Sequence, residues 1–487
     1  MHITRRKLIG STVRAGLGFG LGRHLWACGE EPVAPPPSPQ KALLTFPPEL
    51  TDASLSAART TQVIRPGVST ELWTLGRTYP SPTIRRRRGD TFELELTNEL
   101  AEDTNLHWHG LSVPPDMDGH PRDSVAGGQA RVYRFPIVQR AGTYWYHPHP
   151  HERTAKQVYL GMAGFFIVGD EEEDQIDLPR GELDVPLLLQ DRRFTTGAIE
   201  YVPTMGDVAN GYLGETLFVN GVPSARLEVA STLYRFRALN GSNARTFKLA
   251  FADGRPMHLI GTDGGLIDAP VATNELWLAP AERADLLVDF TPDPIGTSVQ
   301  WMSESFAVGD PGAGHGGHGN AGTLVRQGAR LELLQIDVAR AGPPRTLPTF
   351  LAQLEQLDPT ASVRTRTFEL TPREGVTSGM HVINGQVFAL DRIDEEVPFG
   401  ELEIWRLESK DSVSIHPMHL HGAQFRVVSR SGPTLPSDRG WKDTVLVFPN
   451  ETVELGVRFT DYRGAYLFHC HTLEHEDDGM MLNVNVT

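Results

Sequence analysis

Residues 469–480 read His-Cys-His-Thr-Leu-Glu-His-Glu-Asp-Asp-Gly-Met and bring three kinds of metal-binding side chain into one short stretch. Cys470 is the only cysteine after residue 28, and a histidine stands on each side of it. His475 and Met480 follow within the same stretch. Two imidazoles, one thiolate and a weak axial thioether are the ligand set of a blue-copper site. The stretch therefore predicts a blue-copper electron-transfer site.

The alternation of side chains along a strand gives this stretch a second property. Successive side chains of an extended strand point to opposite faces of the sheet. Cys470 would then face one way, while His469 and His471 face the other. One covalent segment could therefore contact two metal centres on its two sides.

The remaining histidines support a second centre. Ten of the 18 histidines fall in four compact motifs, each containing a His-x-His pair whose imidazoles share one face of a strand. Four such pairs supply eight histidines, too many for one mononuclear site but suited to a cluster of several metal ions. The motif residues that remain, His416, Cys470, His475 and Met480, complete a single blue-copper site. The motifs are His107-Trp-His109, His147-Pro-His149, His416-Pro-Met-His419-Leu-His421 and His469-Cys-His471 with His475.

Composition and charge limit the class of protein. The chain has 487 residues, of which 39% are hydrophobic and 22% charged, so we expect a folded, water-soluble protein. Its formal net charge of −16 argues against nucleic acid as a partner. The bulk properties give no further functional information.

The N-terminus resembles an export signal. Thr4-Arg5-Arg6-Lys7-Leu8-Ile9 matches a twin-arginine pattern and precedes a weakly apolar, Gly-rich stretch, so residues 1–28 are predicted to be a signal. Leu25-Trp26-Ala27-Cys28 resembles a lipoprotein cleavage box; a lipid anchor on Cys28 and a Cys28–Cys470 disulfide are alternatives. The Pro-rich residues 29–42 read as a tether. We expect a periplasmic or otherwise exported protein, attached to a membrane only through such an anchor.

Short apolar runs alternate with turn residues from about residue 43 onward, as in Thr91–Thr97, Gly164–Gly169 and Thr444–Phe448. This pattern predicts an all-β protein built of sandwiches or barrels. Acidic residues 171–177 and the Pro-containing region 338–362 suggest boundaries, which give three domains at 43–175, 176–350 and 351–487. Residues 312–320, Gly- and His-rich, are predicted to be a solvated loop.

The four motifs, together with Trp441-Lys-Asp-Thr-Val445 and the C-terminal His475–Met481 segment, resemble those of three-domain bacterial multicopper oxidases, the group of periplasmic cuprous oxidases and bacterial laccases. The resemblance runs from about residue 43 to residue 487. It implies three cupredoxin-like Greek-key domains, with the metal ligands in the first and the last. It also implies four copper ions: one type 1, one type 2 and a type 3 pair.

The resemblance implies a ligand set for each ion. The type 1 copper takes His416, Cys470 and His475, with Met480 as axial ligand; the type 2 copper takes His107 and His419; one type 3 copper takes His109, His147 and His471, and the other takes His149, His421 and His469.

By the same resemblance, a donor gives one electron at a time near the edge of His475, which the family leaves near the surface. Cys470 then relays the electron to His469 and His471, and O₂ is reduced to two waters. Asp118 and Glu476 match acids that supply protons in similar enzymes; an ordinary turn Asp and a solvated Glu are the alternatives. Asp443 is either a residue that orients a copper histidine or a surface acid.

Three functions remain open at this point. The first is a laccase-like oxidase of phenols or aromatic amines, acting as a monomer. The second is a periplasmic Cu(I) oxidase, which is disfavoured because such enzymes carry a Met-rich insert and this chain has only ten methionines. The third is a copper-free relative of the fold, disfavoured because no ligand position is lost.

Overall fold

The computed structural model describes residues 41–65, 67–195, 198–307 and 325–487. The predicted signal, Cys28, nearly all of the tether and the Gly/His loop at 312–320 lie outside the described residues. Within the described part of the chain, no helix is both long and apolar enough to cross a membrane.

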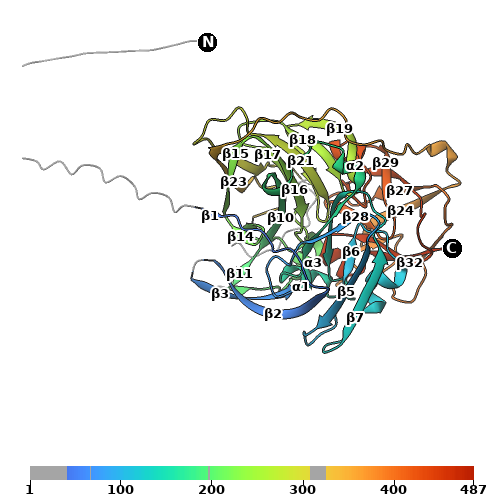
Figure 1. The fold of residues 1–487 in the computed structure, drawn as a ribbon. Coiled ribbons are helices and arrows are strands. Elements are labelled where there is room, and N and C mark those ends of the chain that lie inside the picture. The colour runs from blue at the N-terminus through green and yellow to red at the C-terminus, as the bar shows by residue number, and fades with distance from the viewer. Residues whose placement is uncertain (1–40, 66, 196–197, 308–324) are drawn as a thin grey trace, which may run out of the picture. The chain divides into compact units, whose positions relative to one another are not determined.

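Strands dominate the fold, which confirms the all-β prediction (Figure 1). Two sheets come from residues 54–169, in the strand orders β3-β2-β5-β7 and β4-β9-β8-β6. Their strands are β2 (Ser54–Arg65), β3 (Val68–Leu75), β4 (Ile84–Arg87), β5 (Thr91–Asn98), β6 (His107–His109), β7 (Ala130–Pro136), β8 (Gly142–His147) and β9 (Gly164–Gly169).

The next two sheets come almost entirely from residues 184–341, in the orders β14-β13-β10-β16-β21-β18-β19 and β1-β15-β23-β22-β17-β20. The exception is β1, which crosses over to pair with β15. The strands are β1 (Ala42–Leu43), β10 (Asp184–Arg192), β13 (Thr216–Val219), β14 (Val222–Pro223), β15 (Ala225–Ser231), β16 (Leu233–Asn240), β17 (Phe247–Phe251), β18 (Met257–Thr262), β19 (Gly265–Thr273), β20 (Leu276–Leu278), β21 (Arg283–Asp289), β22 (Ser298–Ser303) and β23 (Leu331–Ala341); β11 (Phe194–Thr195) and β12 (Ala198–Ile199) form a separate pair.

The last two sheets come from residues 364–486, in the orders β25-β24-β27-β31-β29 and β26-β33-β32-β28-β30. Their strands are β24 (Arg364–Pro372), β25 (His381–Ile383), β26 (Glu395–Val397), β27 (Glu403–Ser409), β28 (His416–Leu420), β29 (Phe425–Arg430), β30 (Thr444–Val447), β31 (Thr452–Val457), β32 (Gly464–Cys470) and β33 (Met481–Val486).

The three sheet pairs share a connection pattern. In every one of these six sheets a strand pairs in parallel with a strand from further along the chain, while most other neighbours are antiparallel. Parallel neighbours cannot be joined by a tight hairpin, so the chain crosses between the two sheets of each pair. Each pair encloses its own apolar core.

Short helices fill the connections: α1 (Thr154–Tyr159), α2 (Glu171–Asp174), α3 (Met205–Asn210), α4 (Leu473–Asp477) and the 3₁₀ turns η1 (Pro115–Met117), η2 (Pro121–Asp123), η3 (Gly181–Leu183), η4 (Pro359–Ala361) and η5 (Pro436–Arg439). The acidic stretch after β9 contains helix α2, which begins because the Asp170 side chain accepts a hydrogen bond from the amide of Glu173. At the second predicted boundary, β23 continues to Ala341, and no strand follows until β24.

Candidate metal centres

Strand pairing brings the His-x-His motifs together two by two. His107 on β6 stands opposite His147 at the end of β8, and His419 on β28 stands opposite His469 on β32. Strands β6, β8 and β28 are buried along their whole length and β32 from Tyr466 onward, so they can hold side chains on both faces away from water. The paired motifs contribute eight histidines, none of them more than 1% exposed: His107, His109, His147, His149, His419, His421, His469 and His471.

The eight imidazoles form one group, which we call the histidine cluster. Nε2 of His107 lies 3.3 Å from Nε2 of His419, and Nε2 of His469 lies 3.3 Å and 3.1 Å from those of His149 and His421. Nδ1 of His109 lies 3.4 Å from Nε2 of His147, and the ring centre of His471 lies 5.1 Å from that of His109. Each ligand set expected from the sequence is thus brought together.

Protein oxygens orient most of these rings from behind. Where Nδ1–H donates to a fixed oxygen, Nε2 is left free to face the centre of the cluster. This arrangement holds for five rings: His107 donates to the Asp118 carbonyl at 2.8 Å, His147 to Pro148 O at 2.9 Å, His419 to Asp443 O at 2.8 Å, His421 to Asp118 Oδ2 at 2.7 Å and His469 to Cys470 O at 3.0 Å.

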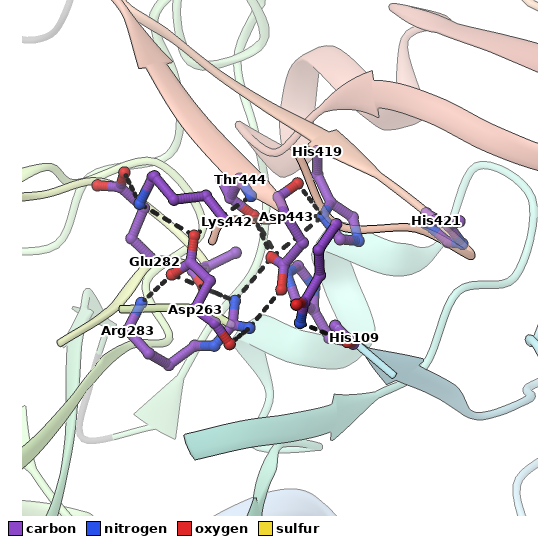
Figure 2. A network of polar contacts seen from close by, with 12 residues as sticks. His109, Asp263, Glu282, Arg283, His419, His421, Lys442, Asp443 and Thr444 are labelled. Carbon is purple, nitrogen blue, oxygen red and sulfur yellow. Dashed lines mark hydrogen bonds and ion pairs between the residues drawn. The ribbon is translucent and has the colours of Figure 1, made fainter. Parts of the chain in front are cut away.

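His109 has the reverse orientation. Its Nε2 lies 3.0 Å from Asp443 Oδ1, so that its Nδ1 faces the cluster. Figure 2 shows Arg283 on the other side of this carboxylate, with both terminal nitrogens bonded to its two oxygens. Burial alone would raise the pKa of Asp443, but the charge and hydrogen bonds of Arg283 hold it well below its usual range.

The cluster suits metal ions. Burial, helped by repulsion between neighbouring imidazoles, lowers the pKa of His147, His149 and His471 well below the usual value, so the rings are neutral and able to bind metal. Both ring nitrogens of His471 are buried without a hydrogen-bond partner among the described residues. Leaving such a polar group unsatisfied is costly, and a bound ion would remove that cost.

A second ligand group contains the thiol. Cys470 Sγ lies 3.6 Å from Nδ1 of His416 and 3.7 Å from Nδ1 of His475, and all three side chains are at most 2% exposed. Met480 is fully buried in the same apolar core, where its carbonyl accepts a hydrogen bond from the amide of Cys470. Cys470 is buried and forms no disulfide within the described part of the chain, and burial raises the pKa of its thiol to about 12.

His475 is not near the surface, contrary to the expectation from the sequence. It is 2% exposed, because helix α3 from the middle sheets lies over it. Its Nε2 lies 3.2 Å from the carbonyl oxygen of Ala209, in that helix. Glu474, beside it in α4, accepts hydrogen bonds from the Tyr201 hydroxyl and the Tyr212 amide, which hold the same covering segment in place.

The two acids singled out in the sequence contact the cluster. Asp118 is fully buried and binds His421, as described, and Glu476 has carboxylate oxygens 3.4 Å from His149 Nε2 and 3.2 Å from His469 Nδ1. Among the described residues, Asp118 Oδ1 has no hydrogen-bond partner. The readings of Asp118 as an ordinary turn residue and of Glu476 as solvated therefore lose support.

Several residues at these centres were missed in the sequence. Asp411 Oδ2 lies 3.3 Å from His416 Nε2 and 3.4 Å from His381 Nε2, and the ring of His381 stacks on His475 at 3.9 Å. Asn105 binds the backbone of His149 through both atoms of its amide. None of these lies in a His-x-His motif, and their roles depend on contacts between distant segments.

Comparison with known proteins decides the family. Two sequence profiles described as multicopper oxidase match residues 57–173 and 356–487. The chain is 31% identical to a multicopper oxidase of Staphylococcus haemolyticus, over 83% of this chain and 82% of the relative. The chain belongs to the multicopper oxidase family.

Other members of this family differ in their named functions. The chain is 30% identical to a laccase of Bacillus subtilis, over 86% of this chain and 90% of the relative. It is 34% identical to the cell division protein FtsP of Escherichia coli, over 85% of each chain. The crystal structure of the McoA multicopper oxidase of Aquifex aeolicus matches with a TM-score of 0.82 and 34% identity, covering 92% of this chain and all of that one.

This likeness confirms the predicted fold of three cupredoxin-like domains and an oxidase function. Membership of the multicopper oxidase family implies copper as the cofactor, and O₂ and a small electron donor as partners.

Proposed function

We propose that this multicopper oxidase oxidises phenols or aromatic amines, one electron at a time, and reduces O₂ to two waters. The observation that carries this proposal is the tripeptide His469-Cys470-His471. Its thiol faces one ligand group, while its two imidazoles belong to the histidine cluster. Bound copper would supply the redox chemistry, both the acceptance of single electrons and the four-electron reduction of O₂.

We further propose four copper ions, held as the sequence resemblance implies. The ligand group of His416, Cys470 and His475, called the thiol group below, would hold a type 1 ion with Met480 as axial ligand. The histidine cluster would hold the other three ions. The short distances within the cluster support this number, since its ligand atoms fall into several sets of three within 4.8 Å of one another. Three of these sets are His107, His419 and His421; His107, His109 and His147; and His149, His421 and His469.

Cys470 is then the link between the two ligand groups. Peptide bonds join it directly to His469 and His471, so an electron can move between the two ligand groups along covalent bonds, without a jump through space. The strand pairing keeps this link rigid, because β32 pairs with β28 on one side and β33 on the other.

Asp118 and Glu476 are proposed to hold and deliver protons. Reduction of O₂ to water consumes protons inside a site that is closed to bulk solvent, so groups that can carry them must lie beside the cluster. Both acids contact cluster histidines, Asp118 through Oδ2 and Glu476 through both oxygens, and Asp118 Oδ1 has no hydrogen-bond partner among the described residues.

Donors are proposed to act from outside helix α3. All four residues assigned to the type 1 ion are at most 2% exposed, so a donor cannot touch them. The hydrogen bond between His475 Nε2 and the Ala209 carbonyl connects this group to a half-buried residue of α3 in one step. Electrons would enter along that bond.

Whether the electron donor is a phenol or Cu(I) depends on which side chains cover His475. Helix α3 carries a single methionine, Met205, which is 49% exposed. One thioether offers little to a Cu(I) ion, which prefers several soft ligands. Oxidation of Cu(I) in copper tolerance is therefore the second candidate. A role in cell division, suggested by the name of one relative, and a copper-free relative of the fold are less favoured, because every proposed ligand is present.

Three further expectations stand with this proposal. The sheet pairs support domains at 43–175, 176–350 and 351–487, with β1 added to the middle sheets. The twin-arginine pattern supports export to the periplasm, with or without a lipid anchor on Cys28. We expect the enzyme to act as a monomer.

The test compares donors on the copper-loaded protein. We expect phenols and aromatic amines to be oxidised with a higher kcat/KM than Cu(I), with two waters formed per O₂ and no hydrogen peroxide released. Cys470→Ser is expected to fold but to lose both the blue absorption and all oxidase activity. A much higher kcat/KM for Cu(I) would overturn the assignment of donor, and turnover by Cys470→Ser would overturn the proposed electron route.

A further inference from the structure

The middle sheets supply none of the proposed copper ligands, yet they place one charged group beside the histidine cluster. Arg283 is the first residue of β21 and is 1% exposed. Arginine has five N–H donors in a rigid plane. Here each has a partner: Thr143 O for Nε, Asp443 Oδ1 and Ala281 O for Nη1, and Asp443 Oδ2 and Asp263 O for Nη2.

These partners fix the guanidinium from three parts of the chain. Thr143 lies in β8 of the first sheets, Ala281 and Asp263 in turns between strands of the middle ones, and Asp443 just before β30 in the last. The carboxylate of Asp443 is held at both oxygens, a two-point contact that sets its plane as well as its position. Figure 2 shows this chain of contacts running from Asp263 through Arg283 to Asp443 and His109.

Asp263 pairs with two cations: its Oδ1 lies 3.6 Å from Arg283 Nη1, and its other oxygen faces Lys442. Lys442 Nζ lies 3.0 Å from Asp263 Oδ2 and 3.0 Å from Glu282 Oε1, and all three side chains are buried. The carboxylate of Asp263 is closer to Lys442 than to the guanidinium, which donates a hydrogen bond to the Asp263 carbonyl. The two-point hydrogen bonds of Arg283 go to Asp443.

His109 shows what the held carboxylate does. Among the cluster histidines bonded to a protein oxygen through one ring nitrogen, His109 is the ring that offers Nε2 to that oxygen and Nδ1 to the cluster. Thr444 Oγ1 donates to the same Asp443 oxygen at 3.0 Å and lies 3.2 Å from both His109 Nε2 and His419 Nδ1. Rotation of the Asp443 carboxylate would break its contacts with His109 Nε2 and with Thr444 Oγ1.

We propose that Arg283 is a positioning residue of the histidine cluster, which acts through Asp443 to hold His109 with Nδ1 toward its type 3 copper. The middle sheets thereby control the geometry of a metal site to which they give no ligand. This inference rests on the proposed function, since it concerns the copper pair assigned there.

The test compares Arg283→Met, Arg283→Lys and Asp443→Asn with the wild type after copper loading. We expect the type 1 blue absorption to be unchanged in all three, because Arg283 contacts none of its ligands. The type 3 pair should lose its magnetic coupling, so that more of the copper gives an EPR signal, and copper retention at the cluster should weaken about 10- to 100-fold. Lysine keeps the positive charge but cannot donate two parallel hydrogen bonds to one carboxylate. Arg283→Lys should therefore show intermediate losses of magnetic coupling and of copper retention.

Two controls separate positioning from general support of the fold. Arg235→Met removes another buried arginine of the middle sheets, paired with Asp285 and Glu173, and should lower stability while leaving the EPR-silent pair intact. In the double variant Arg283→Met/Asp443→Asn, the second change should add no further spectroscopic effect.

Two outcomes would overturn the inference. One is an EPR-silent pair in Arg283→Met as complete as in the wild type; the other is fully additive effects in the double variant. A wild-type protein that binds no copper at the cluster would instead defeat the proposed function. If Arg283→Met fails to fold, Arg283→Lys and Asp443→Asn carry the same comparison.

Discussion

The orientation of single imidazole rings determines what the histidine cluster can bind. Carbonyl oxygens one or a few residues away turn His147 and His469 so that Nε2 is free. Carboxylates from distant segments turn His421 and His109. Because the rings are held before any ion arrives, binding requires little rearrangement, which is the usual benefit of such outer contacts.

A histidine outside the cluster gives a prediction on stability and pH. His120 is buried, and its Nε2–H donates to Asn483 Oδ1 at 2.8 Å, while Nδ1 accepts from Arg122. Burial lowers the pKa of His120 to about 4 from its usual 6.5. A histidine with a lowered pKa in the folded state contributes stability above pH 6.5 that is lost as the pH falls toward 4, here about 3 kcal/mol.

The variant His120→Gln can keep both hydrogen bonds but does not titrate. Between pH 7 and pH 4 its free energy of unfolding should therefore fall by about 3 kcal/mol less than that of the wild type. Denaturant unfolding of both copper-free proteins measures this, since the other buried histidines are common to the two. Equal losses in both proteins would show that His120 does not contribute.

At the residue scale, the sequence predicts identities better than orientations. The His-x-His spacing predicted that all eight histidines lie together, although only His107 and His109 share one strand; His149, His421 and His471 follow the ends of their strands. The reversed ring of His109 could not be foreseen, since it depends on Asp443 and Arg283, which are far away in sequence. His381 gave no signal either, because it begins β25 while its partner Asp411 lies in the connection between β27 and β28.

At the scale of elements, two pieces of secondary structure control the thiol group. Strand β32 carries Cys470 between two cluster histidines, as the alternation predicts. Helix α4 then turns His475 back toward the thiol, and helix α3 covers it. The position of helix α3 over His475 could not be predicted, because residues 205–210 contain no motif that indicates a contact with a residue about 265 positions later.

The proposed electron path through α3 predicts a response to charge. Met205 lies four residues before Ala209 and therefore on the same side of the helix. Met205→Lys is expected to raise kcat/KM for anionic phenols and lower it for cationic amines, and Met205→Glu should do the reverse, by about two- to tenfold at low salt. Added salt should reduce both effects.

The matched control is the exposed Ser412, beside Asp411 on the other approach to the thiol group. Ser412→Lys and Ser412→Glu should leave the ratio of kcat/KM for anionic and cationic donors unchanged. A charge effect at Ser412 and none at Met205 would place electron uptake at Asp411 instead.

At the scale of the whole molecule, one connection pattern occurs three times, and function is divided among the copies. The first and last sheet pairs carry the proposed ligands, and the middle pair supplies the cover over His475 and the arginine behind His109. The all-β fold was predictable from the short alternating runs. The crossover of β1 to the middle sheets was not, because two residues carry too little pattern to show their partner.

The most direct test of the account is the copper content of the purified protein, measured together with its EPR spectrum. We predict four copper ions per chain, of which about two give an EPR signal, one of them from the thiol-bound blue site, while the coupled pair is silent. A protein that is blue but holds a single copper, or one whose copper is entirely EPR-detectable, would contradict a cluster of three ions among the eight histidines.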